Sequence, residues 1–62
     1  MATLEELRKQ QYLSQEDLAK KAEITTGTIN RLENGKQKPR FGTIRRLAKA
    51  LKVNPKDIEF KI

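Results

Sequence analysis

Apolar residues recur three or four positions apart along most of the chain, in short segments separated by turn-forming residues. This spacing places apolar side chains on one face of an α-helix. Five short helices are predicted, over residues 3–11, 14–22, 25–34, 41–51 and a short last one from 55. The inward-facing residues of the first four are Leu4, Leu7, Leu18, Ala19, Ala22, Ile29, Leu32, Phe41, Ile44, Leu47, Ala48 and Leu51, and the last helix carries Ile58. Apolar and polar residues do not alternate over any long segment, so we expect no strand and an all-α fold.

Helix start and stop signals agree with these boundaries. Two capping boxes are predicted, formed by the pairs Thr3–Glu6 and Ser14–Asp17. Thr25 is a further N-cap candidate, and Asn54 precedes a proline at the first position of the last helix. Gly35 fits the left-handed residue just beyond the end of the third helix.

The length and charge of the chain narrow its class. Sixty-two residues make one small domain, 1–62, with a net charge of +6. Residues 25–53 hold eight basic side chains and one acidic one, Glu33. A positive charge gathered in one half favours a polyanionic partner such as nucleic acid, whereas the simpler alternative is that it serves solubility.

Composition also excludes several functions. The chain has neither cysteine nor histidine, which removes disulfides, most zinc sites and the usual nucleophile–base pairs. The carboxylates near helix starts are explained by capping, and Gly35 and Gly42 are isolated rather than part of a phosphate-binding loop. We therefore expect no enzyme activity, no cofactor, no metal, no small-molecule ligand and no membrane segment; the lack of cysteine fits the cytoplasm.

The second and third helices are separated by residues 23–25 alone, so they must cross steeply, as in a helix-turn-helix. An ordinary corner of a helical bundle is the alternative. With Ile29 and Leu32 directed inward, a rotation of about 100° per residue places Gly27, Asn30, Arg31 and Asn34 outward, with Thr26 at the flank. Arginine and asparagine are side chains that pair with guanine and adenine edges.

Several segments now resemble a known family. They are Leu13-Ser14-Gln15-Glu16-Asp17-Leu18-Ala19, Ile29, Leu32-Glu33-Asn34-Gly35-Lys36, Pro39 and Leu47-Ala48-Lys49-Ala50-Leu51. Together they resemble the phage repressor and Cro-type (Xre-like) helix-turn-helix family, over residues 4–58. The resemblance implies a compact five-helix, lambda-repressor-like domain that binds double-stranded DNA, with the third helix in the major groove of a palindromic operator and a homodimer as the binding form.

The resemblance also implies roles for individual residues. Base-reading positions match Thr26, Gly27, Thr28 and Arg31, and the outward face adds Asn30. Phosphate-binding positions match Gln15, Thr25, Asn34, Lys36, Lys38 and Arg40. Arg8 and Glu33 match a buried ion pair, whose disruption should cost about 3–5 kcal/mol.

Three residues depart from the family pattern. Glu23 stands where the turn usually has glycine, so a positive φ there would cost about 1 kcal/mol. Tyr12 stands where glycine or asparagine often ends the first helix. Arg40 replaces the usual Ser or Thr cap of the fourth helix, which adds a charge where a phosphate would lie.

The C-terminal tail carries apolar residues at alternate positions, Ile58, Phe60 and Ile62. One interpretation is that they pack on the core; the other is that Ile58 and Phe60 form a dimer surface. Because family members also act as antitoxins or as bridges to the transcription machinery, a protein-interaction module is the alternative to a DNA-binding transcriptional repressor.

Overall fold

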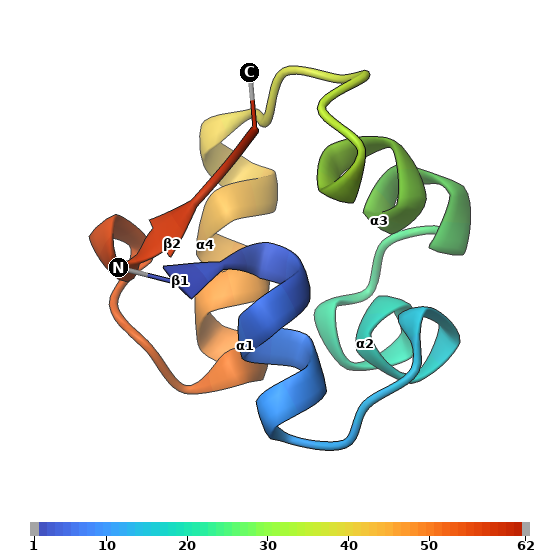
Figure 1. Cartoon of the computed structure of the whole chain (residues 1–62), viewed down its shortest axis with the longest axis vertical. Coiled ribbons are helices and arrows are strands. Elements are labelled where there is room, and N and C mark those ends of the chain that lie inside the picture. Colours follow the sequence, from blue (N-terminus) through green and yellow to red (C-terminus); the bar gives the residue numbers. More distant parts are fainter. Residues whose placement is uncertain (1, 62) are drawn as a thin grey trace.

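The computed structural model describes residues 2–61, which include four α-helices and a pair of very short strands. The helices are α1 (Leu4–Gln10), α2 (Gln15–Ala22), α3 (Thr26–Glu33) and α4 (Phe41–Leu51). A turn of 3₁₀ helix, η1 (Pro55–Asp57), follows α4. The strands are β1 (Ala2–Thr3) and β2 (Ile58–Glu59). In Figure 1, α2 and α3 lie on one side of the molecule and the strand pair on the other.

Both predicted capping boxes are present. The backbone N–H of Glu6 donates to Thr3 Oγ1 at 3.2 Å, and the N–H of Thr3 donates back to Glu6 Oε1 at 2.9 Å. The corresponding distances between Ser14 and Asp17 are 2.9 and 3.1 Å. Each box satisfies two backbone amides that the helix itself leaves without partners, which explains why α1 and α2 begin where the sequence predicts.

The four α-helices within residues 2–61 also end alike. In each case a residue with positive φ follows the helix, and the next residue donates its N–H to the carbonyl five positions before it, as in a Schellman motif. The donors are Leu13, Ile24, Lys36 and Val53, and the acceptors are Arg8, Ala19, Arg31 and Ala48 at 3.2, 3.0, 2.9 and 3.0 Å. Leu13, Ile24 and Val53 also pack on the core, whereas Lys36 is exposed after α3.

The core is formed by all four α-helices and β2. Its buried apolar residues are Leu4, Leu7, Leu18, Ala19, Ala22, Ile29, Leu32, Leu47, Ala48, Leu51 and Ile58. All of these except Ile58 were predicted from helical spacing, and for Ile58 the structure selects packing on the core. Phe41 was predicted to face inward as well, and that was wrong: its side chain is 86% exposed. It occupies the first position of α4, where the helix extends past the core.

The C-terminal part differs from the prediction. The fifth helix is a single 3₁₀ turn, and Ile58 then enters β2, which pairs in parallel with β1 through Ala2 and Ile58. Ile58 is buried and Phe60 is half-buried against the core, so both pack on the domain itself, and a part for Phe60 in a dimer stays a prediction; Ile62 lies outside the described residues. Two-residue strands are too short for alternation to be recognised, and their partners lie at opposite ends of the chain.

Among residues 2–61, no helix is both long and apolar enough to cross a membrane.

Candidate nucleic-acid interface

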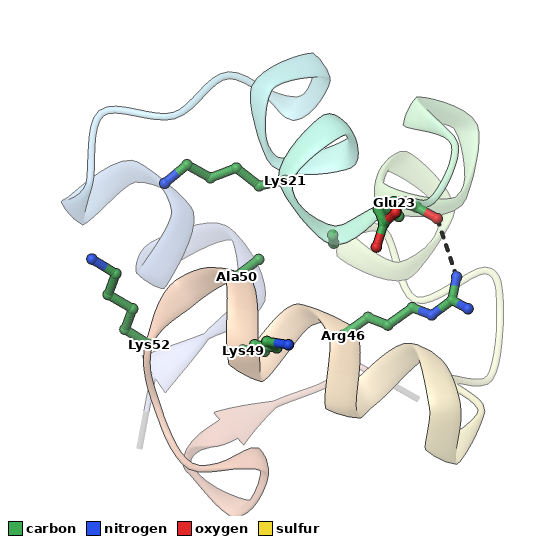
Figure 2. Close-up of a pocket in the computed structure, with 7 residues that line it drawn as sticks. Lys21, Glu23, Arg46, Lys49, Ala50 and Lys52 are labelled. Atoms are coloured by element: carbon green, nitrogen blue, oxygen red, sulfur yellow. Dashed lines mark hydrogen bonds between the residues drawn. The ribbon is translucent and has the colours of Figure 1, made fainter.

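The turn between α2 and α3 is tight and well bonded. Glu23, which stands where the family usually has glycine, has a left-handed backbone conformation with φ 58° and ψ 43°. Its carbonyl oxygen accepts a hydrogen bond from Arg46 Nη1 at 3.2 Å, which connects the turn to α4 (Figure 2). The arginine thus braces the connection that sets the angle between α2 and α3.

α3 begins with a cap supplied by Thr25. Its Oγ1 accepts from the backbone N–H of Thr28 at 3.2 Å and lies 2.8 Å from Thr28 Oγ1. Ile29 and Leu32 then direct one face of α3 into the core. The opposite face is solvent-exposed at Thr26, Gly27, Asn30, Arg31 and Asn34, and Thr28 is half-buried. The structure therefore leaves the predicted outward face open.

Arg31 is held in place on this face rather than extended into solvent. Its Nε donates to Gln37 Oε1 at 2.7 Å, and Nη2 lies 3.4 Å from Thr28 Oγ1. A Cβ atom added to Gly27 would lie 3.2 Å from Arg31 Nη1. The guanidinium thus folds back along α3 toward its N-terminal turn, over the one residue there without a side chain.

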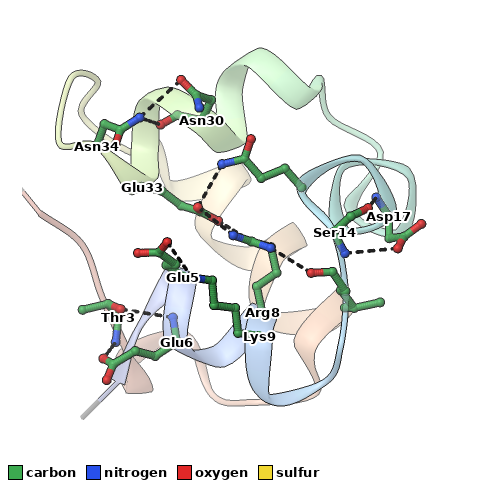
Figure 3. A network of polar contacts seen from close by, with 12 residues as sticks. Thr3, Glu5, Glu6, Arg8, Lys9, Ser14, Asp17, Asn30, Glu33 and Asn34 are labelled. Atoms are coloured by element: carbon green, nitrogen blue, oxygen red, sulfur yellow. Dashed lines mark hydrogen bonds and ion pairs between the residues drawn. The ribbon is translucent and has the colours of Figure 1, made fainter.

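The carboxamide of Asn34 closes the C-terminal end of α3. Its Nδ2 donates to the Asn30 carbonyl at 2.9 Å and lies 3.3 Å from Asn30 Oδ1 (Figure 3). Two polar side chains predicted to meet nucleic acid are thereby brought together one turn apart.

A buried ion pair fixes α3 from behind. Arg8 Nε and Nη2 donate to the two carboxylate oxygens of Glu33 at 2.6 and 3.1 Å, and Arg8 Nη1 donates to the Leu13 carbonyl at 2.8 Å (Figure 3). The side chains are 9% and 4% exposed. The hydrogen bonds from Arg8 to Glu33 raise the pKa of the guanidinium further above its usual range. The single acid of the basic half is therefore neutralised inside the protein.

Gln15, at the start of α2, joins the same network. Its Nε2 donates to Glu33 Oε1 at 3.0 Å, so the first residue of α2 is bonded to the last residue of α3. This bond braces α3 against α2, and the contact of Gln15 with phosphate stays a prediction.

The loop between α3 and α4 carries the cations that the sequence assigned to phosphate. Lys36, Lys38 and Arg40 are all exposed. Gln37, between the two lysines, bonds to Arg31, so this loop lies against the outward face of α3. Arg40 makes no side-chain hydrogen bond to the start of α4, in agreement with its departure from the usual cap residue.

A second basic surface lies elsewhere. The groove between α2 and α4 in Figure 2 is lined by Lys21, Glu23, Arg46, Lys49 and Lys52, with two alanines, and by no residue of α3. The positive charge of residues 25–53 is thus divided: four cations belong to α3 and the following loop, and four belong to α4 and its end.

Two structural residues were not found from the sequence. Gln37 and Arg46 act through single side-chain hydrogen bonds, to Arg31 and to the Glu23 carbonyl. Neither residue lies at a periodic or capping position, so no spacing signal marked them.

Comparisons with known proteins agree with this geometry. A family model described as helix-turn-helix matches residues 4–58. A sequence search of curated proteins gives no match. Among solved structures, the restriction-modification controller protein C.AhdI from Aeromonas hydrophila is similar, with a TM-score of 0.85 and 33% sequence identity over 87% of this chain and 82% of that one. The chain belongs to the Xre-like helix-turn-helix family of DNA-binding transcriptional regulators.

Proposed function

We propose that the protein is a sequence-specific transcriptional repressor that binds a palindromic operator as a homodimer, with α3 of each copy in the major groove. The observation that carries the proposal is the open face of α3, where Arg31 and Asn30 are exposed beside a loop that carries Lys36 and Lys38. A face with this composition suits base edges, and the neighbouring cations suit phosphates.

Residue roles follow from position on this surface. Thr26, Gly27, Thr28, Asn30 and Arg31 belong to the first turns and outward face of α3, and we assign them to base contact. Gln15, Thr25, Asn34, Lys36, Lys38 and Arg40 surround that face, and we assign them to the phosphate backbone. A helix that enters the groove by its N-terminal part is flanked by phosphates on both sides, as in other members of this family.

The experiment is selection from a random duplex library at two salt concentrations, followed by binding of two variants to the selected site. Arg31→Ala is expected to reduce the binding free energy by about 1–3 kcal/mol and to relax the preference at one base pair. Lys38→Ala is expected to weaken all sequences alike. It should also reduce the logarithmic salt slope by about 0.9 for each phosphate that the variant no longer neutralises.

The two variants act as controls for each other. Each removes one exposed cation, so a difference between them reflects the role of the residue rather than net charge. If selection enriches no sequence, the regulator binds without specificity and the proposal is wrong. If Arg31→Ala leaves the sequence preference unchanged, Arg31 does not read a base.

A second copy is proposed because one domain reads little DNA. α3 has eight residues, and a helix of that length rises about 12 Å, which limits one copy to a few base pairs. Phe41 supplies the surface: it is exposed, and with Ile44, Arg45 and Pro55 it lines a mostly apolar groove. It directly follows Arg40, so a partner seated there would extend the proposed DNA-binding side.

A further inference from the structure

The side chain of Arg31 is already restricted in the DNA-free protein. A free arginine side chain samples many rotamers, and fixing it costs conformational entropy. Here the bond from Nε to Gln37 Oε1, at 2.7 Å, already restricts the side chain. Gln37 is half-buried, so the acceptor itself is partly fixed by the loop.

The geometry leaves the correct donors for one kind of contact. Nε donates to Gln37, and Nη2 uses one of its two hydrogens in a long 3.4 Å hydrogen bond to Thr28 Oγ1, so the second Nη2 hydrogen and those of Nη1 are left for a further acceptor. Nη1 and Nη2 together form the end of the guanidinium that can donate to O6 and N7 of one guanine. A glutamine is well suited to accept the hydrogen bond from Nε, because its amide oxygen is neutral and leaves the positive charge of the guanidinium uncompensated.

Gly27 leaves room for the guanidinium of Arg31. A Cβ atom at this position would lie 3.2 Å from Nη1, so a larger residue would require the guanidinium to shift by a few tenths of an ångström from where it now lies. Glycine favours a helix less than alanine does, and its place in the first turn of α3 invites an explanation. Room for the arginine is such an explanation.

We propose that Gln37 is a positioning residue for sequence recognition: together with Gly27 it holds Arg31 so that Nη1 and Nη2 meet a single guanine. The inference rests on the proposed function of α3 as the DNA-reading helix. It adds that part of the specificity resides in a loop residue that need not touch DNA.

The test measures the ratio of affinities for the selected site and for the same site with the guanine opposite Arg31 replaced. Gln37→Met keeps the length of the side chain but removes the acceptor, and it is expected to lower this ratio by about three- to tenfold. Gln37→Glu keeps an acceptor and should preserve the ratio, although its added charge weakens binding to all sequences.

A double-mutant cycle separates positioning from direct contact. In an Arg31→Ala background, Gln37→Met should have no further effect on the ratio. If the effect of Gln37→Met persists there, Gln37 itself contacts DNA and the positioning role is wrong. If Gln37→Met leaves the ratio unchanged in the otherwise native protein, the inference is also overturned.

Gly27→Ala supplies a variant whose effects on stability and on recognition have opposite signs. Alanine should raise the melting temperature, because it favours the helix, while the ratio falls, because Nη1 is displaced. If both the melting temperature and the affinity ratio rise, Gly27 does not help to position Arg31.

Two further readouts keep the outcomes distinct. In the DNA-free protein, exchange of the Arg31 Nε proton with water, measured by NMR, should be slower than in Gln37→Met; equal exchange would mean that the bond does not form and would overturn the inference. If the unmodified protein shows no sequence preference, the proposed function fails and the positioning role fails with it. A clear preference that Gln37→Met does not alter would leave the function intact and remove this inference alone.

Discussion

At the scale of single residues, the backbone is under strain at three helix ends. Tyr12, Glu23 and Lys52 adopt φ values of 57°, 58° and 59°, a region that costs a residue with a side chain about 1–2 kcal/mol. Gly35 adopts φ 70° without that cost. The Schellman motifs at these three helix ends therefore form although their residues prefer negative φ. They depend on the apolar contacts of Leu13, Ile24 and Val53 with the core.

This contrast predicts opposite effects for two substitutions. Glu23→Gly should raise the free energy of unfolding by about 1 kcal/mol, because the left-handed conformation is retained without a Cβ. The backbone carbonyl that Arg46 contacts is unchanged by it. Gly35→Ala should lower the free energy of unfolding by about 1 kcal/mol or more, since the new Cβ would lie 3.1 Å from the Lys61 carbonyl oxygen as well as adopting positive φ. Denaturant unfolding measures both changes.

Glu23→Ala is the control for the first of these substitutions. It removes the carboxylate but keeps a Cβ at positive φ, so its stability should stay near that of the native protein. If Glu23→Ala stabilises as much as Glu23→Gly, the benefit comes from removal of the charge and the strain interpretation is wrong.

At the scale of elements, helix starts connect stability to pH. Hydrogen bonds from the Thr3 N–H and hydroxyl lower the pKa of Glu6 below its ordinary value of 4.5. The same bonds from Ser14 lower the pKa of Asp17 below its ordinary value of 3.8. In both cases the ionised carboxylate is the form that the folded protein stabilises.

The sign of the pH dependence follows. A folded-state pKa below the unfolded one contributes stability above the unfolded pKa, and that contribution is lost as the pH falls through the folded pKa. The free energy of unfolding should therefore decrease as the pH drops below about 4.5, and a Glu6→Gln, Asp17→Asn double variant should lose less over the same range. Urea unfolding at a series of pH values measures the difference, to which carboxylates common to both proteins do not contribute. Equal pH dependence in the two proteins would show that ionisation of Glu6 and Asp17 does not stabilise the folded protein, and would contradict the prediction.

The elements also show what sequence can and cannot predict. The starts of α1 and α2 depend on side chains three residues apart, so local chemistry was sufficient to locate them. The inner face of α3 followed from two residues at helical spacing. The pairing of Ala2 with Ile58 was not predictable in this way, because two-residue strands leave no periodic pattern and their register depends on how the whole chain folds.

The candidate site divides along the same line. Helical geometry was sufficient to predict that Gly27 and Arg31 are exposed. The family resemblance was needed to predict the ion pair between Arg8 and Glu33. The hydrogen bond from Arg31 to Gln37 depends on the path of an irregular loop, which residue types alone do not determine.

At the scale of the whole molecule, charge and apolar surface are distributed over distinct regions. The cations of α3 and its loop adjoin the proposed groove-binding face, whereas Arg46, Lys49 and Lys52 of α4 and its end line a separate groove beside α2. The exposed Phe41 lies at the start of α4, in a groove that it shares with Pro55 of η1. Each domain measures 24 Å along its longest axis, so two in contact can reach half-sites about 34 Å apart.

We therefore expect the protein to form a dimer in which Phe41 is buried. Phe41→Ser should raise the dimer dissociation constant on the order of tenfold or more, because burial of a phenylalanine side chain contributes about 1.5–3 kcal/mol. The side chain is 86% exposed, so the substitution should leave the monomer folded. Tyr12→Asn is the matched control. It removes an aromatic side chain that is 95% exposed, and asparagine tolerates the positive φ at this position.

Sedimentation equilibrium gives the dimer dissociation constants of the native protein and both variants. Binding to a full palindrome and to a half-site shows how dimerisation changes the affinity for DNA. Phe41→Ser should weaken binding to the palindrome while affinity for the half-site is preserved. A native protein that stays monomeric on its palindrome, or a dimer that Phe41→Ser and Tyr12→Asn weaken equally, would contradict this interface, because the first denies a second copy and the second assigns no special role to the start of α4.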